Sequence, residues 1–117
     1  MRTSETIPNL HVDDIEAAGA FFGDVLGLTH QEMGLDWVTR WVDDESGAAV
    51  QLVTQDATAP EDSVMTVKVD DVEAAYAAAQ TAGHEIVHPL TDEPWGITRF
   101  FVRAPGGAVI NVAQHRT

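Results

Sequence analysis

The segment VDDIEAAGA at residues 12–20 recurs almost unchanged as VDDVEAAYA at residues 69–77. The offset is 57 residues (69 − 12 = 57), and seven of the nine positions are identical. A second pair follows in the same order, because GAAVQLV at residues 47–53 matches GAVINVA at residues 107–113 with an offset of 60 (107 − 47 = 60). Two matches in the same order indicate one duplicated module, each copy about half of the chain.

Both copies predict the same series of elements. Alternating apolar residues predict a strand before each repeat. The helix that follows is expected to be capped by Asp13 or Asp14 in the first copy and by Asp71 in the second. The two helices are expected to end at Gly27 and Gly83. In the first helix the apolar stripe is predicted to comprise Ile15, Ala18, Phe22, Val25 and Leu26. Strands are expected at residues 6–12, 29–33, 36–42, 48–54, 63–69, 85–88, 97–103 and 108–113, with a loop from Pro89 through Pro94.

The sequence therefore predicts an α+β fold of two tandem βαβββ modules in one domain over residues 1–117. Module one is expected at 5–54, a polar linker at 55–62 and module two at 63–115. The chain has no cysteine, which excludes disulfides, and no apolar leader or membrane-spanning run, so a cytoplasmic protein without a membrane partner is expected.

The net charge is −13, from 19 acidic and 6 basic residues, and Lys68 is the only lysine. Phosphate binding needs clustered basic residues, so nucleic acid is excluded as a partner. Two interpretations of the acidity stay open. It keeps the protein soluble in a salty cytoplasm, or it draws a cationic ligand into a cleft.

Several motifs carry a family resemblance. The stretch IPNLHVDD at residues 7–14, with FF at 21–22 and LGL at 26–28, resembles the opening of the vicinal oxygen chelate superfamily, which comprises glyoxalases, bleomycin-resistance proteins and extradiol dioxygenases. The second half agrees, with VKVDD at 67–71, PWG at 94–96 and FFVRAPGG at 100–107. One departure is Ala104, where the family usually has aspartate before the Pro-Gly turn.

The resemblance implies that the two modules form a curved mixed sheet around a ligand cavity and that the chain is a homodimer. Metal-using members place ligands at four positions, which in this chain are Ile7, Gln51, Val64 and Asn111. Two of these are aliphatic and two are neutral amides, so no metal and no other cofactor is expected. Either all four pack the floor of the barrel, or they form an apolar patch with two amides that orient an organic ligand.

His11 has the strand parity of Ile7 and Asn9, and its equivalent in the second module is Lys68 (68 − 11 = 57). An acid–base role is one interpretation of this histidine, and a solvated structural residue is the other. Trp37 and Trp41 share one strand face, and Trp95 precedes Phe100 in the second module. These rings are interpreted either as aromatic cavity walls or as core and dimer-interface packing.

We interpret the chain as a metal-free, homodimeric protein that binds a small cationic or aromatic organic ligand, as the antibiotic- or toxin-sequestering resistance members do. A glyoxalase-like lyase or isomerase with atypical metal ligands is the alternative, and an interaction dimer with a collapsed cavity is a third. The sequence favours binding over catalysis without deciding it. The predicted ligand-binding residues are Ile7, Asn9, His11, Trp37, Trp41, Gln51, Val64, Thr66, Lys68, Trp95, Phe100 and Asn111.

Overall fold

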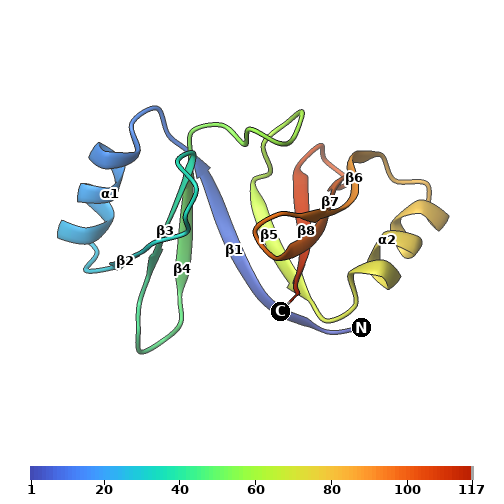
Figure 1. Cartoon of the computed structure of the whole chain (residues 1–117), viewed down its shortest axis with the longest axis horizontal. Coiled ribbons are helices and arrows are strands. Elements are labelled where there is room, and N and C mark those ends of the chain that lie inside the picture. The colour runs from blue at the N-terminus through green and yellow to red at the C-terminus, as the bar shows by residue number, and fades with distance from the viewer. Residues whose placement is uncertain (117) are drawn as a thin grey trace. The chain divides into compact units, whose positions relative to one another are not determined.

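The computed structural model describes residues 1–116, which form two helices and eight strands (Figure 1). Thr117, the last residue of the expected domain, lies outside the described residues. The elements are β1 (Thr3–His11), α1 (Ile15–Asp24), β2 (Thr29–Gln31), β3 (Val38–Val42), β4 (Ala49–Val53), β5 (Met65–Val69), α2 (Val72–Thr81), β6 (Ile86–Glu93), β7 (Ile97–Arg103) and β8 (Val109–His115).

This order confirms the α+β class and the duplicated βαβββ module. In the first copy the strands are hydrogen-bonded in the order β2-β3-β4-β1, and in the second the order is β5-β8-β7-β6. The pairs β1/β4 and β5/β8 are parallel, whereas β2/β3, β3/β4, β6/β7 and β7/β8 are antiparallel. Each module is therefore a mixed sheet whose parallel pair is joined through a helix, as parallel strands require.

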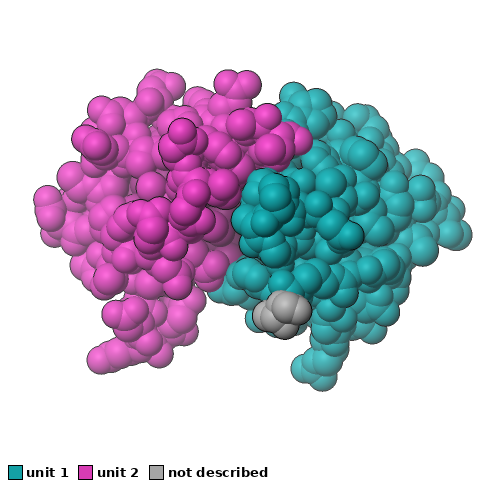
Figure 2. Space-filling view, viewed as in Figure 1, with its two compact units in different colours: residues 1–6, 59–117 teal, residues 7–58 magenta. Residues whose placement is uncertain are grey.

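The chain forms two compact units, residues 7–58 and residues 1–6 with 59–117, which are coloured magenta and teal in Figure 2. The first six residues thus group with the second module, although module one was expected to begin at residue 5. Asp70 explains this grouping, because its Oδ1 accepts from the Arg2 backbone N–H at 2.8 Å and its own N–H donates to the Arg2 carbonyl at 3.1 Å. Lys68 adds an ion pair to Glu5, with Nζ 3.5 Å from Oε1.

Both helices begin and end where the sequence indicates. Of the two candidate caps, Asp14 is the one used, and its Oδ1 accepts from the backbone N–H groups of Glu16 and Ala17 at 3.0 and 3.1 Å. Asp71 accepts from the Ala74 N–H at 3.0 Å. Gly27 follows α1 with φ of 71°, a left-handed conformation that favours glycine after a helix. Helices of 10 residues each are too short to cross a membrane, and no membrane-spanning helix occurs in residues 1–116.

The core of the second module lies between α2 and one face of its sheet. Val69, Val72, Phe100 and Val112 are buried together there, and Tyr76 of α2 packs edge-on against Phe100 with ring centroids 5.0 Å apart. Side chains alternate along a strand, so the neighbours of Phe100 in β7 project from the opposite face. This alternation places the candidate site of the second module on the face away from α2.

Three details of the sequence prediction were wrong. Strand β6 does not stop at Pro89 but continues to Glu93, with register shifts on either side of His88. It is an edge strand, where proline is tolerated because the missing N–H costs no ladder hydrogen bond. The last strand was expected to end at residue 113, but it continues to His115, which pairs with Ile97. In α1 the stripe does not reach Val25 and Leu26, which are exposed, because the helix ends at Asp24.

Candidate functional site

In each module the helix covers one face of the sheet, and the polar predicted residues lie on the other, here called the helix-free face. In the first module Asn9 of β1 pairs with Gln51 of β4, and Gln51 pairs with Arg40 of β3, so these three side chains share that face. Ile7 and His11 have the parity of Asn9 and belong to the same face. Ile7 is fully buried, and Asn9 and Gln51 are buried as well.

In the second module one row of paired residues crosses all four strands. Thr66 of β5 pairs with Asn111 of β8, Asn111 pairs with Phe101 of β7, and Phe101 pairs with His88 of β6. Thr66 and Asn111 were predicted as ligand-binding residues, whereas Phe101 and His88 were not. Partners that lie side by side in a sheet project from the same face, so this row is a continuous strip on the helix-free face.

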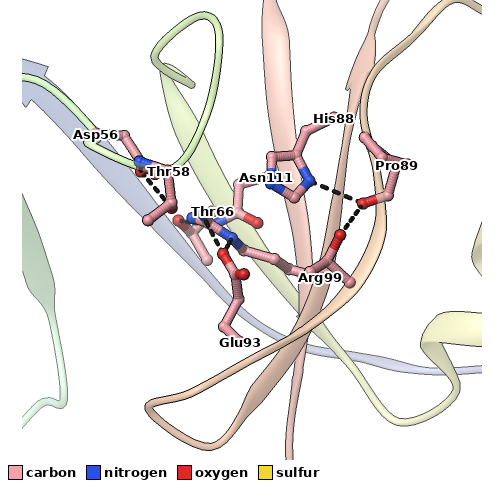
Figure 3. Close-up of polar contacts among 9 residues, drawn as sticks. Asp56, Thr58, Thr66, His88, Pro89, Glu93, Arg99 and Asn111 are labelled. Atoms are coloured by element: carbon pink, nitrogen blue, oxygen red, sulfur yellow. Dashed lines mark hydrogen bonds and ion pairs between the residues drawn. The ribbon is translucent and has the colours of Figure 1, made fainter.

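Polar side chains of this strip are ordered by hydrogen bonds (Figure 3). Asn111 Nδ2 donates to Thr66 Oγ1 at 3.1 Å, and His88 Nδ1 lies 2.7 Å from the carbonyl oxygen of Pro89. The His88 and Phe101 rings pack with centroids 5.3 Å apart. Asn111 Oδ1 is buried and accepts no hydrogen bond from any residue in 1–116. A buried acceptor without a donor lowers the stability of the fold, so a hydrogen-bond donor brought to this oxygen would be stabilising.

A buried ion pair lies beside the strip. Arg99 is 4% exposed, and its Nη2 and Nε are 2.6 and 2.8 Å from Glu93 Oε2 (Figure 3). The guanidinium carbon also lies over two aromatic rings, 4.8 Å from the Phe101 centroid and 5.2 Å from that of Trp95. Carboxylate and rings together compensate the buried charge. We call Thr66, His88, Glu93, Trp95, Arg99, Phe101 and Asn111 the polar cluster.

The polar cluster therefore contains three of the predicted residues, Thr66, Trp95 and Asn111, and four that sequence reasoning missed. One signal could have identified the missed ion pair. Glu93 and Arg99 flank the turn 94–96 in a hairpin where Glu93 pairs with Ile97, so the two side chains are neighbours across adjacent strands. An arginine inside an apolar strand with one acid across the hairpin indicates a buried pair.

Two predicted residues lie on the helix side of their sheets. Phe100 packs on Tyr76 of α2, and Trp41 lies against Gly19 and Gly23 of α1. Both are left out of the site on the helix-free face.

The other predicted residues lie at the margins. Val64 precedes β5 and is 52% exposed, and Trp37 precedes β3, where its carbonyl accepts from the Thr54 N–H at 3.0 Å. Lys68 Nζ lies 3.1 Å from His115 Nε2 in addition to its ion pair with Glu5. His11 is exposed, with Nε2 3.5 Å from Asp13 Oδ1.

The four positions that hold metal in related proteins do not fit a metal ion here. Ile7 and Val64 offer no donor atom, and Asn111 offers only a neutral amide oxygen, since its Nδ2 donates to Thr66. Gln51 contributes a single neutral amide, which is a weak ligand without a carboxylate or imidazole beside it. Within residues 1–116 no three His, Asp, Glu or Cys side chains converge as a potential metal site.

Comparison with solved structures places this fold among known ones. A superfamily member from Vibrio splendidus 12B01 superposes with a TM-score of 0.73 at 24% identity, covering 97% of this chain and 99% of that one. A protein described as NAD-dependent benzaldehyde dehydrogenase from Legionella pneumophila superposes with a TM-score of 0.75 at 14% sequence identity, covering 96% of this chain and 100% of that one. The Mn(II)-bound glyoxalase from Novosphingobium aromaticivorans superposes with a TM-score of 0.66 at 19% sequence identity, covering 97% of this chain but 37% of that one. At these identities the likeness shows the fold alone.

None of the curated proteins matches the sequence. The family model described as Glyoxalase/Bleomycin resistance protein/Dioxygenase superfamily matches residues 7–112, nearly the whole of both modules. The duplicated βαβββ module and the polar helix-free faces agree with this match. The chain therefore belongs to the glyoxalase/bleomycin resistance protein/dioxygenase superfamily.

Proposed function

We propose that this chain is a metal-free binding protein for a small organic ligand, with its site on the helix-free faces of the sheets. The ligand is a planar or aromatic compound that carries hydrogen-bond donors, in the manner of an antibiotic or toxin that is held without being changed. In this proposal the chain is a homodimer, and curvature of the sheets encloses the ligand in a cavity.

The observation that carries the proposal is the unsatisfied oxygen of Asn111. Asn111 Oδ1 is buried without a donor from residues 1–116, next to the Phe101 ring that pairs with it across the strands. A ligand N–H or O–H would donate to this acceptor. A buried acceptor left unpaired costs about 1–3 kcal/mol, and the ligand would remove this cost. The oxygen is covered by its own chain, so a ligand must displace a covering side chain to reach it.

The surroundings favour a flat, positively charged ligand. Phe101 and His88 are adjacent aromatic rings with centroids 5.3 Å apart, a surface of the kind on which an aromatic ligand stacks. Both rings are buried and Arg99 lies over Phe101, so the ligand must displace covering side chains to reach them. The net charge of −13 attracts cations over several ångströms beyond the surface. Arg99 does not oppose this attraction strongly, because Glu93 neutralises it at 2.6 Å.

A lyase or isomerase that uses His11 with atypical metal ligands is the less supported alternative. Such an enzyme must take its metal ligands from residues other than Ile7 and Val64, and within residues 1–116 no three His, Asp, Glu or Cys side chains converge to supply them. His11 is exposed beside Asp13, away from the water-excluded surroundings in which acid–base groups act most strongly.

The test is a fluorescence titration of the purified chain with proflavine, a planar cation, against anthracene-9-carboxylate, a planar anion. Wild type should bind proflavine and not the carboxylate. Asn111→Leu should weaken proflavine binding about tenfold, the scale of one hydrogen bond to a charged donor, whereas Asn111→Asp retains the acceptor and should not weaken it. Failure of proflavine to bind, or equal binding by Asn111→Leu, would contradict the proposal.

Tyr76→Phe is the matched control, because Tyr76 packs on Phe100 from α2 and lies on the other side of the same sheet. It should bind proflavine as wild type does. Sedimentation equilibrium of the same samples tests the proposed homodimer, which has twice the chain mass of 12.6 kDa.

A further inference from the structure

A pocket of about 760 Å³ lies on the helix side of the first module, between α1, the segment after β2 and strand β3. Its apolar lining comes from Ile15 and Ala20 of α1, from Leu35 of the connecting segment and from Trp41 of β3. This volume is within the range of small-molecule sites. The pocket belongs entirely to the unit of residues 7–58 and lies on the helix side of its own sheet, whereas the proposed ligand site is on helix-free faces.

The duplication relates this pocket to the packed core of the second module. Gly19 of α1 corresponds to Tyr76 of α2 (76 − 19 = 57), and the Trp41 indole packs on this glycine where the second module has a phenol ring. Thr39 pairs with Leu52 in β4 as Phe100 pairs with Val112 in β8, and Leu52 corresponds to Val112 (112 − 52 = 60). Glycine and threonine thus stand where Tyr76 and Phe100 pack together in the second module.

Two polar atoms at this pocket have no partner within residues 1–116. The indole Nε1 of Trp41 and the hydroxyl Oγ1 of Thr39 are both buried without a hydrogen bond, and both residues line the pocket. An indole N–H can only donate, and a hydroxyl can donate or accept. The pocket therefore provides an aromatic surface, a feature typical of an organic-ligand site. The two unsatisfied atoms are covered by the chain, so a ligand reaches them only when a covering group moves.

The charged residues of the pocket are acidic. Glu16, Glu32 and Asp36 line it, and no lysine or arginine does. The basic side chain of the lining is that of His30, whose ring centroid lies 5.3 Å from that of Trp41. Glu32 is fixed in place, because its Oε1 accepts from the backbone N–H of Gly34 at 2.9 Å and of Met33 at 3.0 Å. The pocket thus combines carboxylates with the Trp41 ring, which is the chemistry that recognises an organic cation.

We propose that this pocket binds an organic amine, a ligand with an apolar ring that rests on Trp41 and an ammonium group that pairs with Glu32 and Asp36. The ring occupies the pocket beside the Trp41 indole and the small Thr39 side chain. The ammonium donates to the carboxylates. This site is independent of the proposed function, since it lies on the helix side of the first module and uses none of the residues of the polar cluster.

The probe is 2-phenylethylamine, with 3-phenylpropionate as an anion that carries the same ring. The readout is the indole N–H signals of the three tryptophans in a ¹H–¹⁵N spectrum, assigned by elimination with Trp37→Phe and Trp95→Phe so that Trp41 stays intact. The amine should shift the Trp41 signal to saturation, and the carboxylate should not. A Trp41 signal unmoved by millimolar amine, or moved equally by both probes, would overturn the proposal.

Charge variants sharpen the test. Glu32→Gln keeps the acceptor for the Met33 and Gly34 amides while it removes the charge, and Glu32→Gln with Asp36→Asn should weaken amine binding about tenfold or more. Glu45→Gln, in the turn between β3 and β4, is the matched control and should bind like wild type. Equal affinity in the charge variant and in the control would contradict the pairing.

Two further variants separate this site from the proposed one. Thr39→Phe introduces the ring that Phe100 supplies in the second module and should abolish the Trp41 shift while the rest of the spectrum stays folded. Asn111→Leu, which tests the helix-free face, should leave the Trp41 shift unchanged. Loss of the shift in Asn111→Leu would assign the amine to the helix-free face and refute the pocket.

Discussion

A β-carbon added to Gly19 of α1 would lie 2.6 Å from Cζ2 and 3.2 Å from Cε2 of Trp41. One turn later, a β-carbon on Gly23 would lie 2.9 Å from Cζ3 of the same ring. Residues four apart share a helix face, so the two glycines form a flat seat for the indole. Interior glycines weaken a helix by about 0.5–1 kcal/mol relative to alanine, a cost that close packing of Trp41 against α1 offsets here.

Gly19→Ala should therefore destabilise the protein, although alanine is the better helix former. Overpacking typically costs about 1–3 kcal/mol, which exceeds the gain of about 1 kcal/mol in helix propensity. Urea unfolding followed by circular dichroism measures the net change.

The control for this prediction is the same substitution in a Trp41→Val background. Without the indole, Gly19→Ala should become stabilising, because only the gain in helix propensity remains. The double-mutant cycle should therefore give a destabilising interaction free energy between the added methyl group and the Trp41 ring. A stabilising Gly19→Ala in the wild-type background would mean that the ring does not rest on α1 in solution.

The buried pair of Arg99 and Glu93 gives a second prediction. Glu93→Gln leaves the guanidinium, 4% exposed, without its carboxylate and should cost about 3–5 kcal/mol, the range for breaking a buried ion pair. The double variant Arg99→Met with Glu93→Leu removes both charges and should recover much of this loss. Urea unfolding of the two variants checks the expectation.

Arg103 provides the matched comparison, because its guanidinium pairs with Glu61 at 2.8 Å and Glu85 at 3.2 Å near the surface. Exposed ion pairs contribute little, so Glu61→Gln should change stability far less than Glu93→Gln. Equal losses in the two variants would mean that the Arg99 pair is solvated in solution.

The duplication and the module order could be predicted because they depend on local signals. Helix caps, glycines after helices and strand alternation each act within a few residues, and Asp14, Asp71, Gly27 and Gly83 all have the conformations expected of them. Parity assigned Trp37 and Trp41 to one strand face, but it could not say which face of the sheet Trp41 occupies. All five residues of β3 are buried or partly buried, so neither of its faces is marked by full exposure.

What decided the face of Trp41 was the missing side chain of Gly19, a contact between a helix and a strand far apart in the sequence. The ion pair of Glu93 and Arg99 was hidden for a similar reason. It depends on the register of β6 and β7 around the turn at 94–96, and proline at position 89 suggested that β6 ended too early to provide a partner.

The pH dependence of stability should include a contribution from Glu32. Hydrogen bonds from the backbone N–H groups of Gly34 and Met33 lower the pKa of Glu32 below its ordinary value of 4.5. A carboxyl whose pKa is lowered on folding stabilises the protein above its unfolded pKa, and this contribution is lost as pH falls through the lowered folded pKa. Wild type should therefore exceed Glu32→Gln in stability above pH 4.5.

Urea unfolding of both proteins between about pH 3 and pH 7 tests this expectation. The difference in the free energy of unfolding between the two proteins should be constant at the upper end of this pH range. It should shrink as the pH falls, because protonated Glu32 is uncharged like glutamine. A difference that does not change over this range would show that the carboxylate is not held by the Met33 and Gly34 amides in solution.

Removal of metal should have no effect on the folded protein. Ile7 is fully buried and Val64 is half-exposed, and neither can coordinate an ion, while Gln51 and Asn111 add only neutral amides at the remaining family positions. A ligand that binds only the folded state raises the melting temperature, so a chelator would lower it if a metal were bound. EDTA should leave the melting temperature unchanged, and elemental analysis of the purified protein should find no stoichiometric Mn, Fe, Ni or Zn. One tightly held equivalent per chain would instead support the enzymatic alternative and direct attention to donors other than these four residues.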